Sequence, residues 1–102
     1  MFNNSFLKKL NILFIESNTE DREHFSNILY KFFNNVVVCS NGKDGIDNFL
    51  EKRQEYFLDI IICDKTLEDI TGIEVLKKIR EIDSEIPFII ISPKIEVDDL
   101  LI

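Results

Sequence analysis

Four short runs of apolar residues, rich in β-branched and aromatic side chains, are spaced along the chain. They read NILFI at 11–15, VVVC at 36–39, DIIIC at 59–63 and FIII at 88–91. Polar residues do not alternate with apolar ones in these runs, which is typical of strands covered on both faces, as in a parallel sheet. The pattern therefore predicts four buried strands.

Between these runs the apolar residues recur at spacings of three and four, the period of an amphipathic helix. Three helices are predicted in this way, at about 19–33, 42–53 and 72–82. Their apolar faces are formed by Phe25, Ile28, Leu29 and Phe32, by Ile46, Phe49 and Leu50, and by Val75, Leu76, Ile79 and Ile82. Either Ser17, in the sequence Ser17-x-x-Glu20, or Asn18 can cap the first helix.

Strand and helix patterns alternate as β-α-β-α-β-α-β, which predicts an α/β fold with a doubly wound parallel sheet and right-handed crossovers. The chain has 102 residues, enough for one domain with a real core. A fourth helical pattern starts after Ser92, and the sequence stops inside it. We therefore expect a single domain over 1–102, with residues 1–9 as an N-terminal extension and an incomplete carboxyl end.

The charge of the chain bears on its partners. Its 19 acidic and 12 basic residues give a net charge of -7, and such a surface repels nucleic acid and anionic lipid. We expect no direct nucleic-acid binding by this segment. The N-terminus, MFNNSFLKKL, lacks the continuous apolar run of a signal peptide or a membrane span. We therefore expect no membrane association and a cytoplasmic location.

Several chemistries lack the residues they need. Cys39 and Cys63 lie in apolar runs without the C-x-x-C spacing of metal and redox sites, so we expect two buried free thiols. No P-loop or G-x-G-x-x-G motif is present. His24, the single histidine, falls on the first predicted helix beside Glu23, where we expect it to be solvated.

In open parallel α/β sheets, chemistry gathers just beyond the carboxyl ends of the strands. Polar residues stand at these ends: Glu16 and Ser17, then Ser40, then Asp64 to Thr66, then Ser92. Glu16 and Asp64 should lie close together. Adjacent carboxylates repel, so one is protonated or a cation lies between them, and an oxygen-lined site with few protein ligands suits Mg²⁺. The alternative is that both acids cap loops in water.

The segments ILFIESN, NGKDGIDNFL, DIIICDKTLEDITGIEVLKKIR and IPFIIIS occur in this order. They resemble the first strand and acidic pair, the start of the second helix, the phosphoacceptor strand with its loop and third helix, and the fourth strand with its switch hydroxyl in response-regulator receiver domains of two-component signalling. Four segments in the right order make the resemblance specific. It implies a CheY-like (flavodoxin-like) three-layer α/β/α fold with strand order 2-1-3-4, the fifth strand and last helix being absent from the sequence.

The resemblance also implies roles for single residues. Asp64 would accept a phosphoryl group from a histidine kinase or a phosphotransfer protein, as a signalling step and not as an enzyme acting on a substrate. A weakly bound Mg²⁺ would be held by Glu16, Ser17, Asp64 and the main-chain carbonyl of Thr66. Ser92 would supply the hydroxyl that moves toward the phosphoryl oxygens.

The sequence departs from the family at several positions. Ser17 stands where the second residue of the acidic pair is usually aspartate, which removes one anionic oxygen from the metal site. Glu68 stands where proline is usual, and Thr71 where aspartate is frequent. The phosphate-binding lysine of the family lies after a fifth strand that the sequence does not reach. For Ser17, a helix cap is at least as good an interpretation as a metal ligand.

These departures keep other functions open. One alternative is a degenerate receiver that is not phosphorylated and acts as a protein-interaction module. A small hydrolase that uses Glu16 and Asp64 is a third possibility, with no base in the sequence to support it. The strand at 88–91 contains no charge or proline to discourage pairing at its edge. We therefore expect either self-association through this strand or further residues that supply the missing strand.

Overall fold

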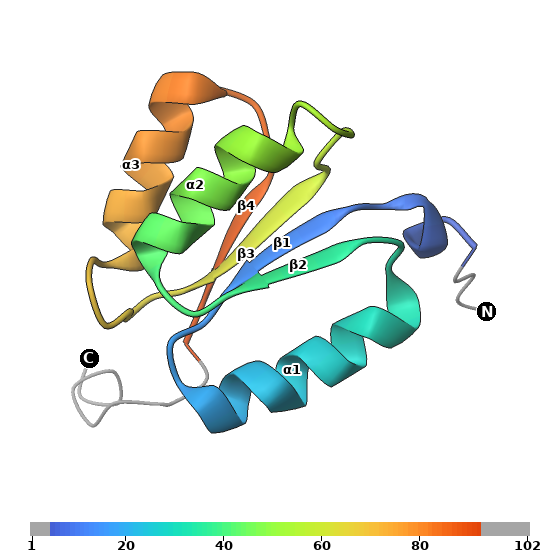
Figure 1. Ribbon diagram of the computed structural model, residues 1–102, viewed down its shortest axis with the longest axis horizontal. Helices are drawn as coiled ribbons and strands as arrows, with labels where there is room; N and C mark the ends of the chain where they lie inside the picture. The colour runs from blue at the N-terminus through green and yellow to red at the C-terminus, as the bar shows by residue number, and fades with distance from the viewer. Residues whose placement is uncertain (1–4, 93–102) are drawn as a thin grey trace, which may run out of the picture.

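A parallel sheet of four strands, in the order β2-β1-β3-β4, forms the centre of the fold (Figure 1). The structure is a computed structural model that describes residues 5–92. Its strands are β1 (Ile12–Ile15), β2 (Val36–Cys39), β3 (Ile60–Asp64) and β4 (Phe88–Ile91). In the register of the sheet, Ile15 lies beside Cys39 on one side and Cys63 on the other. The four predicted strands and their predicted order are confirmed.

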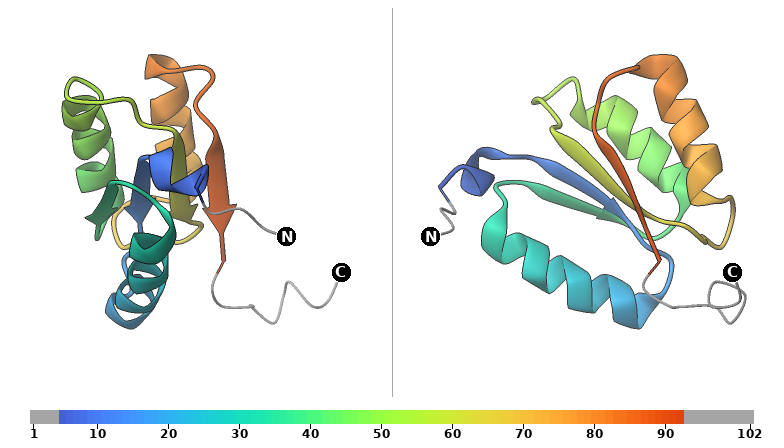
Figure 2. Two further views of the ribbon diagram at one scale, coloured as in Figure 1. Left: turned by 90° about the vertical axis from the view of Figure 1, so that its right-hand side faces the viewer. Right: turned by 180° about the vertical axis from the view of Figure 1, so that it is seen from behind.

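Helices cover the two faces of the sheet, which makes three layers (Figure 2). Helix α1 (Thr19–Phe32) lies on one face, and α2 (Gly42–Lys52) and α3 (Gly72–Ile82) lie together on the other. These bounds agree with the three predicted helices to within one residue. This arrangement follows from right-handed crossovers, because the chain moves from β1 to β2 in one direction and from β2 through β3 to β4 in the other.

Each of the three α-helices begins with a side-chain cap, whereas the short 3-10 helix η1 (Leu7–Lys9) has none. Asn18 accepts a hydrogen bond from the N–H of Asp21 (2.9 Å) at the start of α1, so the predicted cap at Asn18 is confirmed and the alternative cap at Ser17 is wrong. Thr71 and Glu74 form a capping box at the start of α3. Thr71 therefore caps the start of α3, a role that aspartate also performs well.

The main core lies between the sheet and the pair α2 and α3. Alternate residues of the strands point into it, and the most buried members of this cluster are Leu13, Ile15, Ile61, Cys63, Phe49, Val75 and Ile79. Cys39 and Cys63 belong to the same cluster and are free thiols, with β1 between their strands. The predicted buried free thiols are confirmed.

The opposite face of the sheet is less covered. Phe14 and Ile62 of the sheet, with Phe25 and Leu29 of α1, line an apolar groove that reaches Ser92. Ser26 is the one residue of α1 that is buried. On the edge strand β4, Ile89 is 47% exposed. The predicted fourth helical pattern lies outside the described residues.

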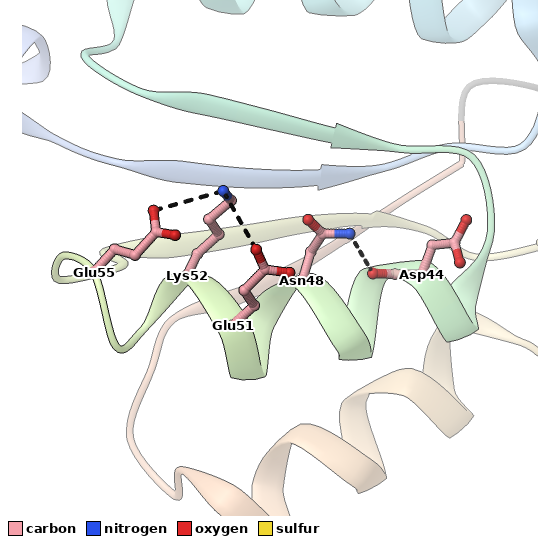
Figure 3. A network of polar contacts seen from close by, with 5 residues as sticks. All are labelled: Asp44, Asn48, Glu51, Lys52 and Glu55. Carbon is pink, nitrogen blue, oxygen red and sulfur yellow. Dashed lines mark hydrogen bonds and ion pairs between the residues drawn. The ribbon is translucent and has the colours of Figure 1, made fainter.

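Polar side chains of α2 and of the turn after it interact at the surface. Lys52 of α2 lies 3.6 Å from Glu55 and 4.0 Å from Glu51, and Asn48 donates a hydrogen bond to the carbonyl of Asp44 (Figure 3). Exposed ion pairs of this kind contribute little to stability. His24 is exposed on α1, as predicted. Within residues 5–92, no helix is both long and apolar enough to cross a membrane.

Candidate functional site

Glu16 and Asp64 meet at the carboxyl edge of the sheet. Glu16 directly follows β1, Asp64 is the last residue of β3, and the two strands are neighbours. Their side chains are close enough for Asp64 to raise the pKa of Glu16. On the far side of β3, Ile91 of β4 is the register partner of Asp64, and Ser92 is the next residue. The predicted proximity of the two carboxyl groups is therefore confirmed.

Glu16 has no exposed surface, and its environment is unusual for a carboxyl group. Oε2 accepts a hydrogen bond from the N–H of Asn18 (3.1 Å), whereas Oε1 receives none from any N–H or hydroxyl group in the described part of the chain. Burial, the neighbouring side chain of Asp64 and the negative charges nearby raise the pKa of Glu16 to about 7. The alternative that both acids lie in water is wrong for Glu16.

The loop after Asp64 folds back on itself. Thr66 and Thr71 form an isolated antiparallel bridge, and the N–H of Gly72 donates to the carbonyl of Lys65 (2.9 Å). At Gly72 the chain passes so close to Asp64 that a Cβ would lie 2.5 Å from the Asp64 carbonyl oxygen. Glycine is needed here because it has no Cβ. Thr66 is exposed in this loop, two residues beyond Asp64.

Ser17 makes contacts that the sequence did not predict. Its Oγ donates a hydrogen bond to the carbonyl of Ser40 (2.7 Å) and accepts one from the N–H of Glu68 (2.9 Å). The carbonyl groups of Glu16 and Ser17 both accept hydrogen bonds from Nη1 of Arg22, at 3.0 Å each. The hydroxyl of Ser17 therefore joins loops instead of capping α1.

Asp69 is a second residue of the site region that sequence reasoning missed. Its carboxylate accepts hydrogen bonds from the N–H groups of Gly42 (2.8 Å), Lys43 (2.9 Å) and Ile70 (2.9 Å). Although burial acts to raise it, these hydrogen bonds hold the pKa of Asp69 below its usual value. No local signal marks this role, because two of the three partners lie on a different element.

The residues present fit a site for a hard cation. Mg²⁺ prefers oxygen ligands and is bound in proteins through one or two carboxylates, keeping several waters. Glu16 and Asp64 supply two carboxyl groups, and Oε1 of Glu16 is a buried acceptor without a donor. Among residues 5–92 no group of three or more His, Cys, Asp or Glu side chains is placed to hold a metal. The candidate site is therefore built on a pair of acids.

Comparison with known proteins identifies the family. The model of a family described as the response regulator receiver domain matches residues 12–101. The chain belongs to this family, as the sequence predicted, and it is thus a receiver domain of the response regulators of two-component signalling. Receiver domains are signalling domains and not enzymes in the usual sense.

Two curated proteins are similar to this chain in sequence. The chain is 30% identical over 89 residues to the cell cycle transcriptional regulator CtrA of Caulobacter vibrioides, covering 87% of this chain and 37% of CtrA. It is 29% identical over 86 residues to the 3',5'-cyclic-nucleotide phosphodiesterase regA of Dictyostelium discoideum, covering 82% of this chain and 11% of that protein. The chain thus spans well under half the length of these curated relatives.

Solved structures share the fold. CheY in a CheX-CheY-BeF3-Mg complex from Borrelia burgdorferi aligns with a TM-score of 0.75 at 22% identity, covering 98% of this chain and 76% of that chain. The receiver domain of Ssk1 from Saccharomyces cerevisiae, in complex with the phosphotransfer protein Ypd1, aligns with a TM-score of 0.66 at 24% identity, covering 84% and 63%. The predicted CheY-like fold is confirmed.

Proposed function

We propose that this domain accepts a phosphoryl group on Asp64 from a histidine kinase or a phosphotransfer protein, in the cytoplasm. The observation that carries the proposal is the buried Glu16 carboxyl, with an oxygen that has no donor, held against Asp64 at the end of a central strand. Burying an acid without full hydrogen bonding is costly, and a cation placed between the two groups would remove that cost.

The chemistry follows from the carboxylate of Asp64. One of its oxygens forms the new bond to phosphorus while the P–N bond of a phosphohistidine breaks, and the imidazole nitrogen keeps the electron pair. Asp64 attacks as the carboxylate, and Glu16 also has to lose its proton before it can hold a metal. The raised pKa of Glu16, about 7, means that metal binding near neutral pH would displace this proton.

Glu16, Asp64 and the main-chain carbonyl of Thr66 would hold Mg²⁺. When bound, the metal would neutralise the oxygens of the transferred group. Ser17 stays a predicted ligand of the metal. It is the weakest of the four predicted ligands because its hydroxyl already makes two hydrogen bonds. Ser92, next to the register partner of Asp64, would provide the switch hydroxyl.

The kind of partner is supported by relatives. The receiver domain of Ssk1 was solved in complex with the phosphotransfer protein Ypd1, and a protein of that class would serve as the phosphoryl donor to Asp64. The net charge of -7 argues against direct binding to nucleic acid by this segment.

Incubation with acetyl phosphate and Mg²⁺, followed by intact mass spectrometry, tests the proposal. We expect the wild-type protein to gain one phosphoryl group and the Asp64→Asn variant to gain none, because the variant lacks the nucleophile. Asp47→Asn is the matched control, since Asp47 is exposed on α2. Labelling of Asp64→Asn to the wild-type level would show that Asp64 is not the acceptor.

A degenerate receiver that only binds other proteins is the second candidate. The observation in its favour is Ser17, which leaves the site with two carboxylates. Under this alternative neither acetyl phosphate nor beryllofluoride with Mg²⁺ changes the wild-type protein at any practical concentration, as seen by mass spectrometry and NMR.

A further inference from the structure

Three loops meet beside Asp64, one after each of β1, β2 and β3, and a single hydroxyl joins all three. Oγ of Ser17, in the loop after β1, donates to the carbonyl of Ser40 after β2 and accepts from the N–H of Glu68 after β3. The hydrogen bond to the Ser40 carbonyl is partly buried, so water competes less for it than at an exposed position, whereas the one from the Glu68 N–H is exposed. Ser17 therefore ties together segments that are far apart in the sequence.

Asp69 makes a second tie, between the loop after β3 and the start of α2. Its two carboxylate oxygens accept from the N–H groups of Gly42 and Lys43, the first two residues of α2. The first N–H groups of a helix have no partner inside the helix, and this end attracts negative charge. Helix α2 already has a local cap, because Asn41 accepts from the N–H of Asp44. Asp69 therefore adds a link from another element.

Both ties end on the short segment 40–43. The loop after β3 packs closely against this segment, since a Cβ at Gly42 would lie 2.4 Å from Cγ1 of Ile70. Residues 68–70 are thus fixed to the start of α2. This fixed stretch begins two residues beyond Thr66, whose carbonyl is a proposed metal ligand.

The position of Ser17 gives its hydroxyl a geometric role. Ser17 follows Glu16 directly, so its link to Glu68 sets how far Glu16 lies from the loop that carries Thr66. Aspartate, the usual residue of the family here, accepts hydrogen bonds but cannot donate one to the Ser40 carbonyl. Serine does both. The substitution removes a charge from the site and adds a link that exists before any metal binds.

We infer that Ser17 and Asp69 are positioning residues, which preassemble the Mg²⁺ and phosphoryl site by holding Glu16 and the loop 65–71 at a fixed separation. This inference rests on the proposed function. It differs from the prediction that Ser17 is itself a ligand, because here Ser17 acts through the loop without touching the metal.

The test compares two variants of equal shape at Ser17. Ser17→Thr keeps the hydroxyl and Ser17→Val removes it. We expect Ser17→Val to bind Mg²⁺, and beryllofluoride with Mg²⁺, at least about 10-fold more weakly than Ser17→Thr, the scale on which outer-shell partners affect metal binding. Backbone amide exchange should report the same loss, with faster exchange of the Glu68 N–H in Ser17→Val alone.

Two controls separate positioning from general stability. Ile79→Val, in the core of α3, lowers stability at a site distant from the loops, and its Mg²⁺ affinity should equal that of the wild type. Asp69→Ala removes the second tie without changing Ser17; we expect weaker Mg²⁺ binding and faster amide exchange at Gly42 and Lys43. Asp69→Ala also carries the test if Ser17→Val does not fold.

The outcomes are distinguishable. Equal Mg²⁺ affinities of folded Ser17→Val and Ser17→Thr would overturn the positioning role and leave the proposed function intact. The same conclusion follows if Ile79→Val weakens binding as much as Ser17→Val does. If the wild-type protein binds neither Mg²⁺ nor beryllofluoride, the proposed function fails, and the positioning role fails with it.

Discussion

The carboxyl groups of Glu16 and Asp64 lie together at the ends of the neighbouring strands β1 and β3, and Glu16 is wholly buried. Two carboxylates in this position cannot both be ionised without cost, so the pair holds a proton or a cation. The relationship links the stability of the fold to the chemistry of the site, and the first two predictions follow from it.

Stability without metal should fall as the pH rises. The pKa of Glu16 is about 7 in the folded protein, above the ordinary value of 4.5 for a glutamate side chain. The folded state therefore binds this proton more tightly than the unfolded state, and the stability it provides is present below about pH 4.5 and lost as the pH rises to about 7. Thermal unfolding in EDTA should give a lower midpoint at pH 8 than at pH 5.5.

Glu16→Gln is the control for this pH dependence, because it keeps the shape and cannot ionise. Its unfolding midpoint should change much less over the same range. The lowered pKa values of Asp69 and Asp83 act at more acidic pH and in the opposite direction. Equal slopes for the wild type and Glu16→Gln between pH 5.5 and 8 would show that another group titrates.

Glu16→Gln should also slow phosphorylation without abolishing it. The variant loses one negative charge from the proposed metal site, whereas Asp64 keeps its nucleophilic oxygens. We expect the rate of labelling by acetyl phosphate at fixed Mg²⁺ to fall about 10-fold, which corresponds to a barrier higher by about 1.4 kcal/mol. Higher Mg²⁺ should restore part of the rate. A complete loss at saturating Mg²⁺ would assign Glu16 a direct part in the transfer.

The two cysteines should resist alkylation in the folded protein. Burial and nearby acids raise the pKa of Cys39 to about 11 and that of Cys63 to about 12. The reactive thiolate is then about one part in a thousand or less at pH 8. Titration with a thiol reagent should find almost no reaction in native buffer and two thiols after unfolding in denaturant. Rapid modification of the native protein would show that β2 or β3 opens readily.

Self-association through β4 is the fourth prediction. Within the described residues β4 is an edge strand, and Ile89 on it is 47% exposed beside the apolar groove under α1. Such an edge favours pairing with a second chain. Light scattering should show a mass that increases with protein concentration, and Ile89→Lys should suppress the increase.

Ile73→Lys is the matched control for Ile89→Lys. Ile73 is 46% exposed, but it lies on α3 and not at the sheet edge. The same change of charge there should leave self-association unaltered. A monomer at all concentrations in the wild type, or equal effects of the two variants, would count against β4 as the contact.

The sequence alone determined the elements and the centre of the site. Strands and helices follow from periods that each segment carries within itself, and the four strands and three helices lie where those periods placed them. Glu16 and Asp64 come together because both follow apolar runs that become neighbouring parallel strands. In a parallel sheet, residues that follow neighbouring strands lie close together, so local patterns were enough to predict this proximity.

Only the tertiary structure decided what Ser17 and Asp69 do. Ser17 was expected to cap α1 or to bind metal; Asn18, one residue later, forms the cap, and the metal role stays a prediction. The hydroxyl instead bonds to Glu68, 51 residues away, and Asp69 bonds to Gly42, 27 residues away. A short polar side chain can satisfy its hydrogen bonds with any donor or acceptor within about 3 Å. The partner of each side chain depends on how the loops pack. The sequence near Ser17 and Asp69 has no period or motif from which that partner could be predicted.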